Sequence, residues 1–135
     1  MHRKPCEWLF LLACLTGSLA AAHHSFPAVY DATARTTVEG VVTEVLYQNP
    51  HSRVYLSVEG SDGQEEIWEL ETQNTSFLRR GGWLPDSVQV GDRLTVEGNL
   101  AFEIEKRLYI QVVTQEDGNV LWVQDPAPLR EEGYR

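Results

Sequence analysis

Hydrophobic and polar residues alternate along much of the chain after position 36, with the two-residue period that is typical of half-buried β-strands. The clearest case is the segment 53–59, in which Val54, Leu56 and Val58 share one face. Similar stretches rich in β-branched residues recur between Gly, Pro, Asn and Asp turn residues. The predicted strands cover residues 37–47, 53–59, 65–71, 88–98, 107–115 and, as a short last strand, 120–123.

One stretch breaks the alternation and predicts a short helix. Residues 72–80 place Phe77 and Leu78 among polar neighbours, and Gly81 follows as a helix-ending residue. Three strands, a short helix and then two strands is the order of an OB-fold, and Gly40 suits the bend of its first strand. We therefore expect a mostly β protein, a small five-stranded OB-fold-like barrel with one short helix between strands three and four. Periodicity does not give strand order, so another small barrel or a sandwich stays open.

The beginning of the chain has the three parts of a cleaved secretory signal, which are a basic start, an apolar run and small residues. Arg3 and Lys4 precede an apolar run that starts at Trp8, and three alanines end at Ala22. The run is shorter than the roughly 20 apolar residues that a membrane-spanning helix needs. We expect a periplasmic or secreted protein that starts at His23 and keeps no stable membrane span.

Two other ways of processing the signal stay open. Cleavage after Ala21 would put the bulkier Leu19 at a recognition position, and lipidation of Cys14 would leave an unusually short apolar run before it. Cleavage before Ala22 would make His24 the third residue of the mature chain, and a histidine at that position forms a good copper chelate with the free amine. The expected divisions are a signal at 1–22, an N-terminal segment at 23–36, a barrel at 37–123 and a C-terminal tail at 124–135.

Charge and cysteine content narrow the classes of partner. Removal of residues 1–22 leaves 113 residues, enough for one domain, with 9 basic and 19 acidic side chains and a net charge of −10. Such a charge repels nucleic acid, whose binding depends on Lys and Arg. It suits a cation, a basic protein surface or a neutral small ligand. Cys6 and Cys14 both lie in the predicted signal, so the mature chain has no thiolate ligand or nucleophile.

Four short motifs follow one another along the chain. They are His-His-Ser-Phe at 23–26, Asn-Pro-His at 49–51, Leu-Arg-Arg-Gly-Gly-Trp at 78–83 and Gly-Asp at 91–92. In this order and over this length, the chain resembles a family of short exported bacterial proteins of unknown function. The resemblance extends to about Val123. It implies export and a small β-rich domain, and it supplies no catalytic residue.

The three histidines of the predicted mature chain suggest a metal site. The α-amine and imidazole of an N-terminal His23 can chelate one ion, and both nitrogens are available near neutral pH. A further imidazole from His24 or His51 would complete a planar set of three nitrogens, which favours Cu(II). The sequence thus predicts a copper site with ligands His23, His24 and His51. The plainer alternative is a solvated His pair and a loop His51 that bonds to backbone.

Aromatic residues give a second candidate site, without a metal. Tyr55 and Trp68 can line a barrel face of the kind on which OB-folds stack ligands, although Trp68 can equally fill the barrel core. Glu69 and Glu71 are expected on a solvated strand face. Since no Cys and no Gly-x-Ser-x-Gly elbow are available, we expect a non-catalytic binding protein. Its partner would be Cu(II) or, alternatively, a small ligand or an envelope protein bound by an OB-like interaction module.

Overall fold

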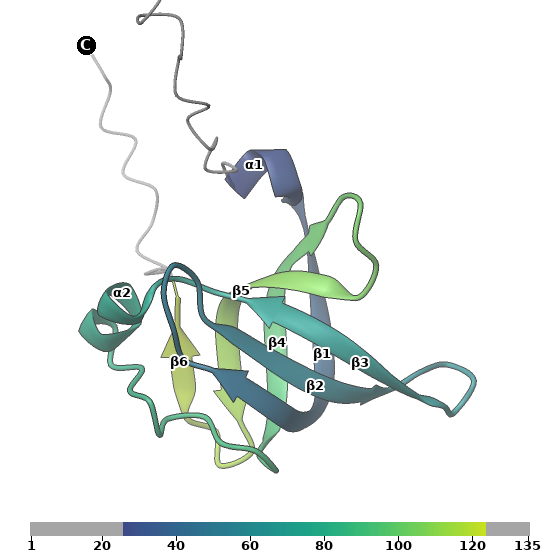
Figure 1. Ribbon diagram of the computed structural model, residues 1–135. Coiled ribbons are helices and arrows are strands. Elements are labelled where there is room, and N and C mark those ends of the chain that lie inside the picture. Colours follow the sequence, from purple (N-terminus) through teal and green to yellow (C-terminus); the bar gives the residue numbers. More distant parts are fainter. Residues whose placement is uncertain (1–25, 124–135) are drawn as a thin grey trace, which may run out of the picture.

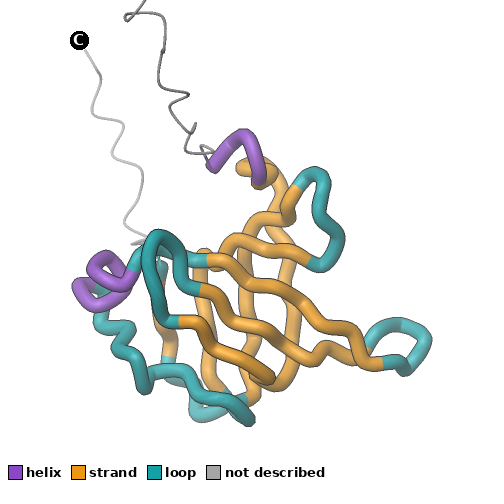
Figure 2. The backbone as a smooth tube through the Cα atoms, viewed as in Figure 1, coloured by secondary structure: helices purple, strands orange, loops and turns teal. Residues whose placement is uncertain are grey.

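The structure is a computed structural model that describes residues 26–123. This part of the chain consists of six strands and two short helices (Figure 1). The elements are α1 (Phe26–Val29), β1 (Tyr30–Leu46), β2 (Arg53–Glu59), β3 (Glu65–Glu71), α2 (Thr75–Arg80), β4 (Arg93–Ala101), β5 (Arg107–Gln115) and β6 (Val120–Trp122). The two helices lie at the periphery of the strands (Figure 2). Neither helix of this part is long and apolar enough to cross a membrane.

The strands close into a barrel. They are ordered β3-β2-β1-β4-β5-β6, and an additional pairing joins β3 to β5. This last pairing is parallel, whereas β1 to β5 are otherwise joined by antiparallel ladders. The resulting ring β1-β2-β3-β5-β4, with α2 between β3 and β4, is the five-stranded OB-fold that the sequence predicts. The short β6 adds to β5 beside the ring.

The long first strand joins both sides of the barrel, because it pairs with β4 along one stretch and with β2 along the next. A shift of register between Val42 and Glu44 marks a bulge, which bends the strand. Gly40 permits the close approach to β2, since a Cβ there would lie 2.4 Å from the Ser57 carbonyl oxygen. Gly40, which was expected to help bend this strand, is therefore also needed for a steric reason, because a larger residue would clash with β2.

Several predicted boundaries are corrected. The first strand begins at Tyr30 rather than residue 37, because its polar beginning pairs with β4, as in the register of Arg35 with Asn99. The fourth strand covers Arg93–Ala101 rather than 88–98. The predicted helix begins at Thr75 rather than residue 72, because the Asn74 side chain caps it by accepting from the Phe77 backbone N–H.

The core fills the inside of the barrel with aliphatic side chains from all five ring strands. In β3, Leu70 is fully buried, and the alternation of the strand therefore turns its neighbours Glu69 and Glu71 to the outside. The same rule applies in β5, where Leu108 is buried in the core and Tyr109 lies on the other face. This alternation places two carboxylates and a tyrosine on one outer face of the barrel.

Candidate functional site

A pocket of about 500 Å³ lies on this outer face, where α1 and the loop between β1 and β2 meet the ends of β2, β3 and β5. Strand register brings its polar residues together, because Glu71 pairs with Arg53 on one side and with Tyr109 on the other. His51 reaches the pocket from the loop, and Phe26 lines it from α1. Residues from four separate parts of the chain therefore share one cavity.

A chain of two hydrogen bonds crosses the pocket through Glu71. The Tyr30 hydroxyl donates to Glu71 Oε2 at 2.8 Å, and His51 Nδ1 bonds to Glu71 Oε1. A carboxylate can only accept, so Nδ1 carries the hydrogen, and in the neutral imidazole Nε2 keeps its lone pair. Glu71 is 8% exposed, while the His51 side chain is 46% exposed. The buried carboxylate thus orients an accessible imidazole, which is how metal-binding histidines are commonly held.

The neighbouring carboxylate binds the two arginines of the pocket. Arg107 Nη2 donates to Glu69 Oε1 at 2.6 Å, and Arg53 Nε lies 2.9 Å from the same oxygen, out of line for a hydrogen bond. Burial opposes the charge of Arg107, but the hydrogen bond and charge of Glu69 outweigh it and raise the pKa of Arg107. Glu69 therefore balances the arginines and leaves Glu71 to Tyr30 and His51.

Three aromatic rings form the apolar wall of the pocket. Phe26 stacks on Tyr30 with ring centroids 5.6 Å apart and meets Tyr109 edge-on at 5.0 Å. Burial, with a smaller contribution from Glu71, raises the pKa of Tyr109 to about 12, and burial with the Glu71 hydrogen bond raises that of Tyr30 further. Both phenols therefore stay protonated at neutral pH, and Tyr30 can act only as the donor to Glu71.

The structure describes some of the predicted site residues and not others. His51 lies in the pocket, whereas His23 and His24 lie outside the described residues. Between residues 26 and 123, no three His, Cys, Asp or Glu side chains come close enough to hold a metal ion. Tyr55 is half-buried in β2, in register with Glu69. The roles of His51 and Tyr55 in binding stay predictions.

Trp68 packs against the core, as one of its two interpretations expected, and its Nε1 is buried without a hydrogen-bond partner. The expectation of a solvated face is wrong for Glu71, which Tyr30 and the surrounding pocket bury. Sequence reasoning also missed Tyr30 as a pocket residue. Arg53 and Glu71 each stand next to a buried aliphatic residue in their strand, and this alternation predicts that both face outward. Only the strand register shows that the two residues lie side by side.

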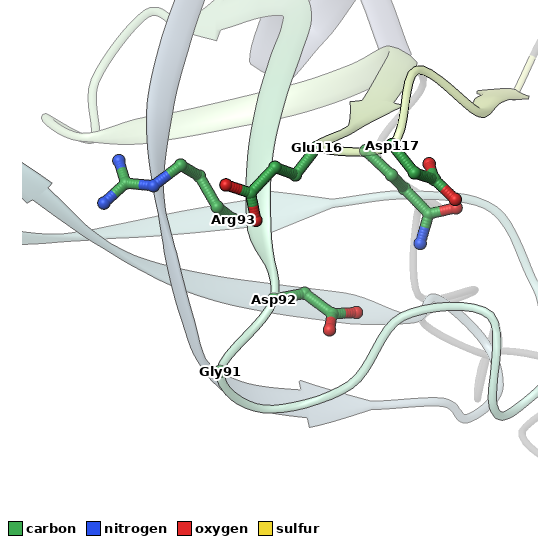
Figure 3. Close-up of a pocket in the computed structure, with 6 residues that line it drawn as sticks. Gly91, Asp92, Arg93, Glu116 and Asp117 are labelled. Carbon is green, nitrogen blue, oxygen red and sulfur yellow. The ribbon is translucent and has the colours of Figure 1, made fainter.

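A second cavity, of about 410 Å³, lies between the start of β4 and the turn after β5, and it is lined by three acidic residues together with Arg93. Figure 3 shows Glu116 and Asp117 pointing in opposite directions. Asp92 is engaged within its own turn, where its Oδ2 accepts from the Gln89 backbone N–H at 2.8 Å. Since the carboxylates do not converge, this cavity is the weaker candidate for a cation site.

Comparison with protein families and known proteins gives one family match. A family of unknown function (DUF6152) matches residues 11–107. No curated protein matches the sequence. Among solved structures, two of the mitochondrial single-stranded DNA-binding protein Rim1 from S. cerevisiae are similar. One has 15% identity and a TM-score of 0.49, covering 62% of this chain and 93% of that chain. The other, selenomethionine-labelled, has 14% identity and a TM-score of 0.47, covering 64% and 97%. A likeness of this extent carries no information about ligands.

Proposed function

The chain belongs to the family of unknown function DUF6152, and we propose that it is a small exported, periplasmic, non-catalytic protein that binds Cu(II). In this proposal the α-amine and imidazole of His23 form the main chelate. His51, and in addition His24, supply further imidazole nitrogens. Nitrogen ligands of this kind favour Cu(II) over the other common divalent ions.

The observation that carries the proposal is the hydrogen bond between His51 Nδ1 and Glu71. It leaves the Nε2 lone pair of a half-exposed imidazole available in a pocket. The plainer interpretation of His51, a loop histidine whose ring bonds to backbone, does not account for this carboxylate partner. A carboxylate behind a histidine fixes the ring and raises its basicity as a ligand.

The second support is the place where the N-terminal segment enters the described structure. Phe26 lines the same pocket as His51, and His23 precedes it by three residues. Three residues span at most about 11 Å, so the amine and imidazole of His23 are within chain reach of the pocket. The net charge of −10 that is predicted for the mature chain attracts cations in addition.

The alanine variant His51→Ala tests the contribution of the loop ligand. We expect it to weaken Cu(II) binding by at least about tenfold, or about 1.4 kcal/mol, because one of the nitrogen ligands is lost. The measurement is a competitive Cu(II) titration of the exported protein, after mass spectrometry has located its N-terminus at His23 or Ala22. Gln48→Ala, in the same loop, is the control and should bind as the wild type does.

Two results would count against the copper proposal. A lipidated Cys14 as the mature N-terminus would remove the amine–imidazole chelate altogether. Unchanged affinity in His51→Ala would remove His51 from the site and leave only the chelation that any N-terminal histidine provides.

The size of the pocket favours one second candidate, an interaction module that binds a small organic ligand or a side chain of an envelope protein without metal. Its volume of about 500 Å³ lies within the roughly 300–1,000 Å³ of small-molecule sites, and it combines aromatic walls with convergent polar groups. This candidate predicts ligand binding that survives removal of His23 but is lost when Tyr109→Ala opens the aromatic wall. Screening a small-molecule library by ligand-observed NMR against these two variants separates the two functions.

A further inference from the structure

We propose that Tyr30 is a positioning residue for the pocket, which acts through Glu71 to hold His51 with Nδ1 protonated and Nε2 facing outward. The inference concerns the metal-free protein. Its consequence for copper affinity rests on the proposed function.

The geometry ties together three elements that are far apart in sequence. Tyr30 is the first residue of β1, Glu71 is the last residue of β3, and His51 lies in the loop between β1 and β2. The hydroxyl of Tyr30 occupies Oε2 and the imidazole occupies Oε1. Because each oxygen has its own partner, the carboxylate cannot rotate without losing one of the two bonds.

The Tyr30 ring is itself held firmly in place. It is 3% exposed and packs against both Phe26 and Tyr109. The backbone on either side is fixed, since Val29 accepts from the Phe102 N–H at 2.9 Å and Asp31 accepts from Asn99 Nδ2 at 2.7 Å. The hydroxyl thus reaches Glu71 from a fixed position, which is the condition for controlling the carboxylate.

Loss of the Tyr30 hydroxyl would give Glu71 competing partners. The Nε atoms of Arg53 and Arg107 are buried and have no hydrogen-bond partner, and both side chains line the same pocket. Arg53 is also the direct cross-strand neighbour of Glu71. A buried acceptor without its donor is costly, so a released Oε2 would turn toward an arginine and draw Oε1 away from His51.

The test compares two tyrosine variants by ¹⁵N NMR of the His51 imidazole in the metal-free mature chain, at mildly alkaline pH. The wild type should show the Nδ1–H tautomer. Tyr30→Phe should show a mixture of both tautomers, with Cu(II) affinity lower by about 10- to 100-fold. Tyr109→Phe is the matched control, because it removes the hydroxyl of the other buried tyrosine of the pocket, whereas the hydroxyl that donates to Glu71 is that of Tyr30.

Three results would overturn the inference. They are an Nε2–H tautomer in the wild type, an unchanged tautomer in Tyr30→Phe, and an equal change in both variants. Should Tyr30→Phe fail to fold, an Nε2–H tautomer in the wild type would still overturn the inference. A tautomer change confined to Tyr30→Phe supports the inference, and it does so even where no form of the protein binds copper, in which case only the proposed function fails.

Discussion

Acetylation of the N-terminal amine of the mature chain is expected to weaken Cu(II) binding by about 100- to 10,000-fold, the range by which linking two ligands strengthens binding over either one alone. The amine and imidazole of His23 form one chelate ring in the proposed site. Without the amine, His23 becomes a single imidazole on a short segment, and the ion loses its strongest attachment. The measurement is a competitive Cu(II) titration of the acetylated and unmodified proteins.

The reagent that acetylates the amine also modifies lysine, and Lys106 is the one lysine between residues 23 and 135. Lys106 pairs with Glu66 at 3.0 Å and does not line the pocket. The variant Lys106→Gln therefore serves as the control and should bind Cu(II) like the wild type. Wild-type affinity in the acetylated protein would place the copper ligands elsewhere in the chain.

Leu70→Ala is expected to lower the free energy of unfolding by about 2–5 kcal/mol, since it removes a fully buried leucine from the barrel core. Ile67→Ala, in the same strand, is the matched control. Ile67 is 54% exposed, and its loss should change stability by no more than about 0.5 kcal/mol. Chemical denaturation followed by circular dichroism measures both variants.

This comparison also bears on the site. Leu70 lies between Glu69 and Glu71, so its burial is the reason that both carboxylates face outward. Equal losses of stability in Leu70→Ala and Ile67→Ala would mean that β3 does not have this alternation. The carboxylates would then not share the face on which the pocket is built.

The local pattern of apolar and polar residues was sufficient to predict the bounds of three strands. The predicted segments 53–59, 65–71 and 107–115 are confirmed as β2, β3 and β5. The first seven residues of β1 were not predictable in this way. The run from Asp31 to Thr36 has no large apolar residue. Its strand is joined to β4 at Tyr30 and again from Arg35 onward, which are contacts made across the fold. The parallel pairing of β3 with β5 has no local signal at all.

The candidate site was predictable only as far as residue type allowed. His51 stood out because histidines are few and have a known affinity for metals. Tyr30 and Glu71 did not, because their hydrogen bond joins positions 41 residues apart and depends on barrel closure. The charge of Glu71 predicted a solvent-exposed side chain. The side chain is buried because Tyr30, His51 and the rest of the pocket surround it. Export and the roles of His23 and His24 stay predictions.

The most direct test of a copper site shared by His23 and His51 is paramagnetic broadening of backbone amide signals in the mature chain by one equivalent of Cu(II). Signals from Phe26, His51 and Glu71 should be lost first, while those of the distant Val120 and of Ile67 persist. Broadening that spares His51 and Glu71, or that centres on Asp92 and Asp117, would contradict the account.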